Sequence, residues 1–196
     1  MLFRYFGQQA AWERKGFRFK MPIKLLDSTL VSLTISVYDW AHYTTSKGAV
    51  KMHTLLDYDC LLPEFMNITG GKRTDNKAAF DIEIKPHSIV VADRGYCDYG
   101  LLNHWDSNNV FYVVRHKDDI QHRTIKELPL PEKHAQNVLL DEIIEFELPT
   151  AKDKCPKRLR RIAVWDEEHG FVIELLSNNV TLAASTIAKL YKARWN

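Results

Sequence analysis

Alternating apolar and polar positions dominate the first part of the chain. Residues 23–35 interleave branched and apolar side chains with Ser, Thr and one Asp, and residues 49–59 repeat this pattern after a turn-forming segment. Because no apolar stripe of helical spacing emerges, we expect two strands that pair as a hairpin. A third run at 61–69 ends at Gly70 and Gly71, so the chain is predicted to open with a three-stranded meander.

A shorter and wholly apolar pattern follows. Residues 88–92 form a continuous run, SIVVA, of the kind that is buried on both faces of a sheet. A short helix is predicted over 74–81 and a second helix over 97–107. Residues 109–117 supply a fifth strand, rich in β-branched and aromatic side chains. The predicted order over residues 22–117 is therefore β-β-β-α-β-α-β.

Beyond residue 117 the pattern changes again. Prolines punctuate short strand-like pieces between residues 118 and 178, which favours a β-rich insertion. From Thr181 to Asn196 the apolar positions take helical spacing, and Thr181 is a suitable N-cap. The side chains expected on the apolar face of this helix are Leu182, Ile187, Leu190 and Tyr191.

Composition places the chain in an ordinary globular class. Its 196 residues are 45% hydrophobic and 27% charged, which argues against a disordered tail or a coiled coil. No apolar run approaches the ~18 residues of a membrane helix, and the N-terminal residues lack the apolar segment of a signal peptide. We therefore expect a soluble cytoplasmic protein without a membrane partner. The three cysteines are widely spaced, which favours neither a disulfide framework nor a zinc site.

Charge is nearly balanced overall but clustered locally. The chain has 27 Lys and Arg against 25 Asp and Glu, without the excess that by itself indicates a nucleic-acid partner. Between Lys152 and Arg161, however, six residues are basic and only Asp153 is acidic. Such a run is either a solvated loop or a DNA-binding element. Under the second interpretation, Arg158, Arg160 and Arg161 contact the DNA backbone.

Two aspartates interrupt otherwise apolar strands. Asp27 lies within LLDST and Asp93 directly follows the apolar run of VVADRGY. A carboxylate in such a place requires a partner, and either residue alone is explained by a turn or a salt bridge. On neighbouring strands, however, the two would repel each other unless a divalent cation lay between them, and their hard oxygens suit Mg²⁺ or Mn²⁺. Such a pair is the core of a two-metal site for phosphoryl transfer.

Five segments, taken in order, resemble one family: LLDSTLVSL, KGAVKMHTLLD, VVADRGYCDYGLL, FYVVRHK and LYKARWN. Together they are similar to the DDE transposases of bacterial insertion sequences, in the subgroup with a Tyr-x-x-Arg-x-x-x-Glu-x-x-x-x-x-x-Lys signature. The resemblance covers about residues 22–196. It implies an α/β fold, with a ribonuclease-H-like mixed sheet, flanking helices and a β-rich insertion. It also implies that Asp27 and Asp93 are the first two catalytic acids and ligate Mg²⁺ or Mn²⁺.

The resemblance implies a partner and further site residues. Double-stranded DNA, as transposon ends and as target, is the expected partner, and the full-length parent is expected to be a homodimer. Tyr191 and Arg194 match the first half of the signature and lie at i and i+3, where both side chains can reach one phosphate. Trp195 is expected to stack on an exposed base. The implied activity is metal-dependent strand cleavage followed by strand transfer.

The family pattern extends past both ends of this sequence. The Glu and Lys of the signature would follow Asn196, and a DNA-binding domain would precede the first strand. We therefore expect a fragment or a disrupted reading frame that lacks the third acidic residue and is inactive alone. The expected divisions are a remnant of the N-terminal region (1–21), the first part of the catalytic core (22–117), the insertion (118–178) and the start of the signature helix (179–196).

Two other functions are compatible with these residues. A non-catalytic remnant of a disrupted transposase could still bind DNA or dimerise, and the missing Glu favours this alternative for the chain itself. A metal-dependent nuclease that cleaves without strand transfer is the third interpretation. The Tyr191-x-x-Arg194 element has no evident use in a simple nuclease and argues against it.

Overall fold

The computed structural model describes residues 17, 19–33, 48–117, 121–130 and 137–195. These residues form one nine-stranded sheet with helices on both faces. The strands are β1 (Ile23–Leu33), β2 (Gly48–Asp57), β3 (Pro63–Gly70), β4 (Ile89–Ala92), β5 (Phe111–Arg115), β6 (His122–Glu127), β7 (Val138–Phe146), β8 (Leu159–Asp166) and β9 (Phe171–Ser177). The helices are α2 (Asp75–Ala79), η3 (Arg94–Tyr96), α3 (Tyr99–Ser107), α4 (Pro149–Lys154), α5 (Ala184–Lys192) and η4 (Ala193–Trp195).

The first half of the sheet has the predicted strands. β1, β2 and β3 form the expected antiparallel meander. Within it, Asp27 pairs with Thr54. β4 then lies beside β1 in parallel, with Leu26 opposite Ala92, and β5 lies parallel to β4. All four residues of β4 are buried because helices cover both faces of the sheet there. The turn expected before residue 48 lies outside the described residues.

The predicted insertion is β-rich and continues the same sheet. β9 pairs with β5 antiparallel, from Val113 opposite Ser177 to Arg115 opposite Leu175, and β8, β7 and β6 follow outward. Strand β6 and helix α4 were not expected from the sequence pattern. β6 is mostly polar because it lies at the edge of the sheet, and α4 begins at a proline, which is acceptable in the first turn of a helix. The four division boundaries stay a prediction.

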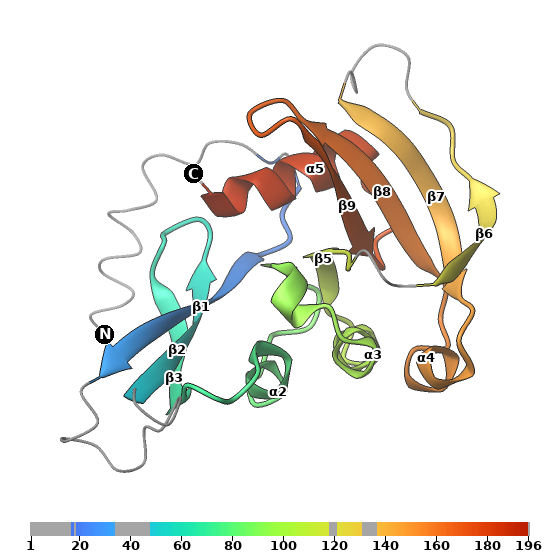
Figure 1. Ribbon diagram of the computed structural model, residues 1–196. Helices are drawn as coiled ribbons and strands as arrows, with labels where there is room; N and C mark the ends of the chain where they lie inside the picture. The colour runs from blue at the N-terminus through green and yellow to red at the C-terminus, as the bar shows by residue number, and fades with distance from the viewer. Residues whose placement is uncertain (1–16, 18, 34–47, 118–120, 131–136, 196) are drawn as a thin grey trace.

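Two apolar cores lie on opposite faces of the sheet. Figure 1 shows α2, α3 and α4 on one face and α5 on the other. The side chains of β1 alternate between the cores, with Leu26 packed toward α3 and Leu25 toward α5, as the pleat requires. Trp105 of α3 is almost completely buried and lies against Tyr112 of β5. Among the described residues, none of the helices has the length and apolar character needed to cross a bilayer.

Helix α5 begins later than predicted. The expected N-cap, Thr181, instead belongs to a turn organised by Asn179, whose side-chain oxygen accepts hydrogen bonds from the Thr181 amide and hydroxyl and from the Leu182 amide. The helix therefore starts at Ala184. The expected apolar face is confirmed for Ile187, Leu190 and Tyr191, which are buried against the sheet.

Candidate active site

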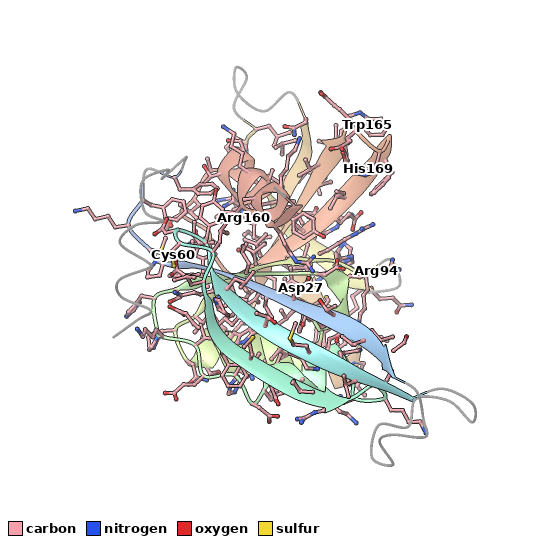
Figure 2. All side chains as sticks on the ribbon, turned by 90° about the vertical axis from the view of Figure 1, so that its left-hand side faces the viewer. Asp27, Cys60, Arg94, Arg160, Trp165 and His169 are labelled. Atoms are coloured by element: carbon pink, nitrogen blue, oxygen red, sulfur yellow. The ribbon has the colours of Figure 1, made fainter. Side chains whose placement is uncertain are left out.

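Asp27 lies in β1, and Asp93 directly follows β4, the adjacent parallel strand. Leu26 of β1 is in register with Ala92 of β4, so the residues that follow them are neighbours. Asp27 lies two positions after Leu25 and therefore points to the α5 face of the sheet. In Figure 2, Asp27 and Arg94, the residue after Asp93, lie near each other below α5.

Arg194 bridges the two carboxylates. Its Nη2 atom lies 2.5 Å from Oδ1 of Asp27, and its Nη1 atom lies 3.8 Å from Oδ2 of Asp93. The Arg194 side chain is 6% exposed, whereas those of Asp27 and Asp93 are 55% and 38% exposed. A nearly buried guanidinium thus closes the inner side of the pair, and the outer side of both carboxylates faces solvent.

Tyr191 of α5 makes the second contact, one turn before Arg194 of η4. Its hydroxyl donates to Oδ1 of Asp93 at 3.3 Å, and Asp93 Oδ1 also accepts from the Arg94 amide at 2.7 Å at the start of η3. Burial, reinforced by the negative charge of Asp93, raises the pKa of Tyr191 to about 12. The phenol is therefore protonated at neutral pH and acts as a hydrogen-bond donor.

The residues of the site fit a divalent metal ion. Two carboxylates converge there, and in this structure a cationic guanidinium balances their charge. Hard carboxylate oxygens are the ligands that Mg²⁺ and Mn²⁺ prefer. Within the described part of the chain, no group of three or more His, Cys, Asp and Glu side chains is arranged to hold a metal. Asp27 and Asp93 would provide two ligands, and the remaining positions would be left for water or phosphate oxygens.

Gly95 lies in η3, where α2 packs closely against the turn that follows Asp93. It does not adopt a positive φ. A Cβ atom added there would lie 3.0 Å from a carboxylate oxygen of Asp75. A larger residue at this position would therefore require the Asp75 side chain to shift.

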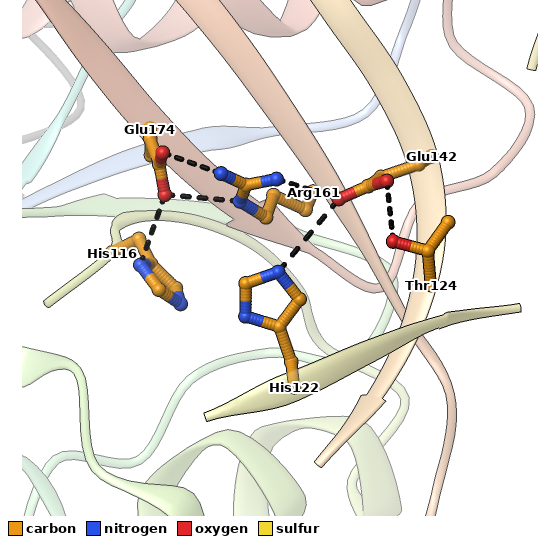
Figure 3. A network of polar contacts seen from close by, with 6 residues as sticks. All are labelled: His116, His122, Thr124, Glu142, Arg161 and Glu174. Atoms are coloured by element: carbon orange, nitrogen blue, oxygen red, sulfur yellow. Dashed lines mark hydrogen bonds and ion pairs between the residues drawn. The ribbon is translucent and has the colours of Figure 1, made fainter. Parts of the chain in front are cut away.

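Two buried histidines near this end of the sheet, His53 and His116, lie on the opposite face from the acidic pair. His53 is buried in β2, where its Nε2 atom lies 3.1 Å from the Thr69 hydroxyl. The next residue, Thr54, pairs with Asp27, so the side chain of His53 points to the opposite face of the sheet from Asp27. His116, at the end of β5, lies 3.2 Å from Glu174. Figure 3 shows His116 in a polar network that crosses the sheet on the α3 side.

The basic run is largely neutralised within the fold. Arg160 is 4% exposed and forms a bidentate salt bridge with Asp141, so the prediction that Arg160 contacts DNA is wrong. Arg161 lies between Glu174 and Glu142 (Figure 3), which balances its charge. Neighbouring residues of β8 point to opposite faces, and here both faces provide carboxylates.

The other basic residues between Lys152 and Arg158 lie in helix α4 or in the exposed segment that follows it. Lys152 of α4 lies 3.5 Å from Glu145, and Lys157 pairs with Asp106. Arg158 is exposed, so the prediction of a DNA contact stays open for this residue. The Trp195 side chain lies outside the part of the chain that the structure describes, and its predicted stacking on a base stays a prediction.

Arg115 is a site neighbour that the sequence analysis missed. It ends β5, next to the strand that precedes Asp93, and its positive charge acts on Tyr191. Its guanidinium carbon lies 5.3 Å from the ring centroid of Phe171. The available signal was the basic residue directly after the apolar run FYVV, at the same end of the sheet as Asp93.

The fold and the acidic pair together define a ribonuclease-H-like domain with two carboxylates at neighbouring parallel strands. The chain belongs to the transposase DDE domain family, which matches residues 18–196.

Individual relatives agree with this assignment. A protein of Geobacillus stearothermophilus, named as a transposase for insertion sequence element IS5377, is 27% identical over 182 residues, which cover 93% of this chain and 47% of that protein. Transposase y4zB of Sinorhizobium fredii is 28% identical and covers 88% of this chain and 48% of its own length. The chain thus spans about half the length of these curated relatives.

A solved structure supports the fold alone. The piggyBac transposase in a synaptic complex with hairpin DNA superposes with a TM-score of 0.50 at 11% identity, covering 88% of this chain and 37% of that chain. The mixed sheet and its ribonuclease-H-like arrangement are thereby confirmed.

Proposed function

We propose that this chain forms the part of a DNA transposase that provides the first two metal-ligating carboxylates, Asp27 and Asp93. The observation that carries the proposal is their placement on adjacent parallel strands under Tyr191 and Arg194. The parent protein would cleave a DNA strand and join its 3′ end to target DNA, as the family membership supports. DNA is the proposed partner, and the homodimer of the parent stays a prediction.

The residues of the site have separate roles in this proposal. Asp27 and Asp93 hold Mg²⁺ or Mn²⁺, which when bound supplies Lewis-acid chemistry for attack of an oxygen nucleophile on a DNA phosphate. Tyr191 orients Asp93 through its hydroxyl. Arg194 donates to a phosphate oxygen once the carboxylates have another cation to pair with, because a guanidinium binds both groups in the same geometry.

The DNA-facing surface is proposed to follow α5. Lys189 and Lys192 are exposed on this helix, on the same face of the sheet as the acidic pair. These two lysines are the positive charges of α5 that lie closest to the site. Arg194 is already paired with Asp27. Cationic side chains of this kind position a DNA backbone without reading its sequence.

Mn²⁺ binding tests the acidic pair directly. Asp27→Asn and Asp93→Asn are each expected to weaken Mn²⁺ binding about tenfold or more, because each removes a charged oxygen ligand from a site that has two. Loss of the free Mn²⁺ signal in electron paramagnetic resonance measures the affinity. The matched control is Asp153→Asn, an exposed aspartate of α4 on the other face. Equal affinities for all four proteins would exclude a metal site at Asp27 and Asp93.

DNA binding tests the α5 surface. The double substitution Lys189→Glu and Lys192→Glu is expected to lower affinity for duplex DNA about tenfold and to reduce its salt dependence, because two phosphate contacts are lost. Arg158→Glu, on an exposed segment before β8, is expected to change affinity less than about twofold. Fluorescence anisotropy of a labelled duplex over a series of salt concentrations measures both. A larger loss for Arg158→Glu than for the double variant would place the DNA on the opposite surface.

A further inference from the structure

We propose that Arg160 is a positioning residue that sets where helix α5 presents Tyr191 and Arg194 to the acidic pair. This proposal rests on the proposed function in one respect, because that function gives Tyr191 and Arg194 their role in the site. The anchoring itself follows from the contacts of Arg160, which connect two strands of the insertion to the segment that leads into α5.

The Arg160 side chain joins three parts of the chain. Its Nε and Nη2 atoms donate to the two oxygens of Asp141 on β7, each at 2.7 Å. Its Nη1 atom donates to the backbone oxygen of Asn179 at 3.2 Å and to that of Leu182 at 2.6 Å. A planar guanidinium fixes all four directions at once, so the backbone of residues 179–182 is tied to the β7–β8 pair.

The same segment is anchored to the catalytic half of the sheet. The Ser177 hydroxyl donates to the backbone oxygen of Tyr112 on β5 at 2.6 Å and accepts from the Asn179 amide at 3.0 Å. Asn178 accepts from the Tyr112 amide and donates to the backbone oxygen of Val110. The chain therefore leaves β9 with its backbone position fixed on one side by β5 and on the other by Arg160.

Helix α5 depends on such an anchor for its direction. It has nine residues and an N-cap, Ala183, without a side-chain hydrogen bond, and helices of this length are marginal without tertiary contacts. From Leu182 to Arg194 the chain advances about 18 Å at the helical rise. A tilt of about 5° at the start would therefore move the far end by about 1.5 Å, enough to separate Arg194 from Asp27.

The energetics favour a role in positioning over one in stability. Arg160 and Asp141 are both nearly inaccessible, with side chains 5% and 4% exposed. A buried ion pair costs about as much in desolvation as it returns, and apolar replacements of similar volume are often neutral or stabilising. An alternative pair of apolar side chains could fill this space, but it would not hold the carbonyl groups of residues 179 and 182 in place.

The test follows the contact between Tyr191 and Asp93 in metal-free protein. 3-Fluorotyrosine placed at position 191 gives a ¹⁹F resonance that reports the hydrogen bond, and Asp93→Ala in the same protein gives the resonance without it. Arg160→Met is expected to move the signal at least halfway toward that of Asp93→Ala. The matched control, Arg161→Met, removes the neighbouring arginine, which pairs with two glutamates on the other face, and is expected to leave the signal in place.

A second variant separates positioning from folding. Arg160→Met alone leaves Asp141 buried without its partner, which destabilises proteins strongly, so Arg160→Met combined with Asp141→Leu replaces the whole ion pair by apolar side chains. We expect this double variant to fold and still to show the displaced resonance, with Arg160→Lys giving an intermediate displacement. A wild-type resonance in the double variant would overturn the proposal. Because neither metal nor DNA is present, this result is independent of the Mn²⁺ measurement that tests the proposed function.

Discussion

Replacing Arg194 with Met is expected to raise the affinity of the metal-free protein for Mn²⁺ about tenfold. The guanidinium now lies 2.5 Å from Asp27 and 3.8 Å from Asp93, so it and a metal ion compete for the same carboxylates. Removing a cation that contributes about 1.4 kcal/mol to the metal-free state gives a tenfold change in affinity. Calorimetric titration with Mn²⁺ measures this change.

The sign of the change in Mn²⁺ affinity shows whether Arg194 competes with the metal ion for the carboxylates or helps to hold the metal site. Lys192→Met removes the same charge from an exposed position of α5 and is expected to change Mn²⁺ affinity only slightly, because screened surface charges act weakly. Arg194→Lys, which keeps the charge, should stay close to wild type. If Arg194→Met bound Mn²⁺ more weakly than wild type, the guanidinium would be a support for the metal site and not its competitor.

Acid is expected to destabilise the fold through Glu174. A hydrogen bond from His116, followed by the contacts with Arg161, lowers the pKa of this carboxyl from 4.5 to about 2. Because the folded pKa lies below the unfolded one, the stabilisation is complete above about pH 5 and is lost as the pH falls toward 2. With the partial exposure of Glu174 taken into account, its contribution at neutral pH is about 1–2 kcal/mol.

Urea unfolding at pH 6 and pH 3 measures this contribution. Glu174→Gln is expected to be less stable than wild type at pH 6, and the difference should shrink by about half at pH 3, because much of the stabilisation is then lost from the wild type. The network in Figure 3 also contains Glu142 and His122, which titrate as well. Their effect cancels when the free energy of unfolding of Glu174→Gln is compared with that of the wild type at the same pH. Glu147→Gln, at an exposed position, is the control. A constant difference between wild type and Glu174→Gln at both pH values would contradict the role of Glu174.

The acidic pair could be predicted from sequence because its signal is local. An Asp at the end of a short apolar run and another within a long alternating strand are each visible in a few residues, and parallel pairing of the two strands then brings them together. The i, i+3 spacing of Tyr191 and Arg194 is local in the same sense, and in the structure the two side chains contact Asp93 and Asp27. Their contact with a DNA phosphate stays a prediction.

The fate of the basic run could not be predicted in this way, because it depends on pairing between strands. Arg160 and Arg161 are adjacent in sequence and point to opposite faces of β8, where Asp141 and Glu142 of β7 meet them. The acidic doublet of one strand and the basic doublet of the next were the available signal. Only the antiparallel register, with Glu142 opposite Arg161, shows which charges face each other and which are buried.

The sequence separation of the contacts at the acidic pair has a kinetic consequence. β1 pairs with β4, and β5 with β9, across similar separations, 66 positions from Ile23 to Ile89 and 65 from Tyr112 to Ser177, whereas Arg194 reaches Asp27 across 167 positions. Contacts of such long sequence separation form late because the loop must first close. Asp27 and Asp93 should therefore come together before Tyr191 and Arg194 reach them, because these two contacts span 98 and 167 positions. The last event of folding is then the arrival of the helix that covers the carboxylates.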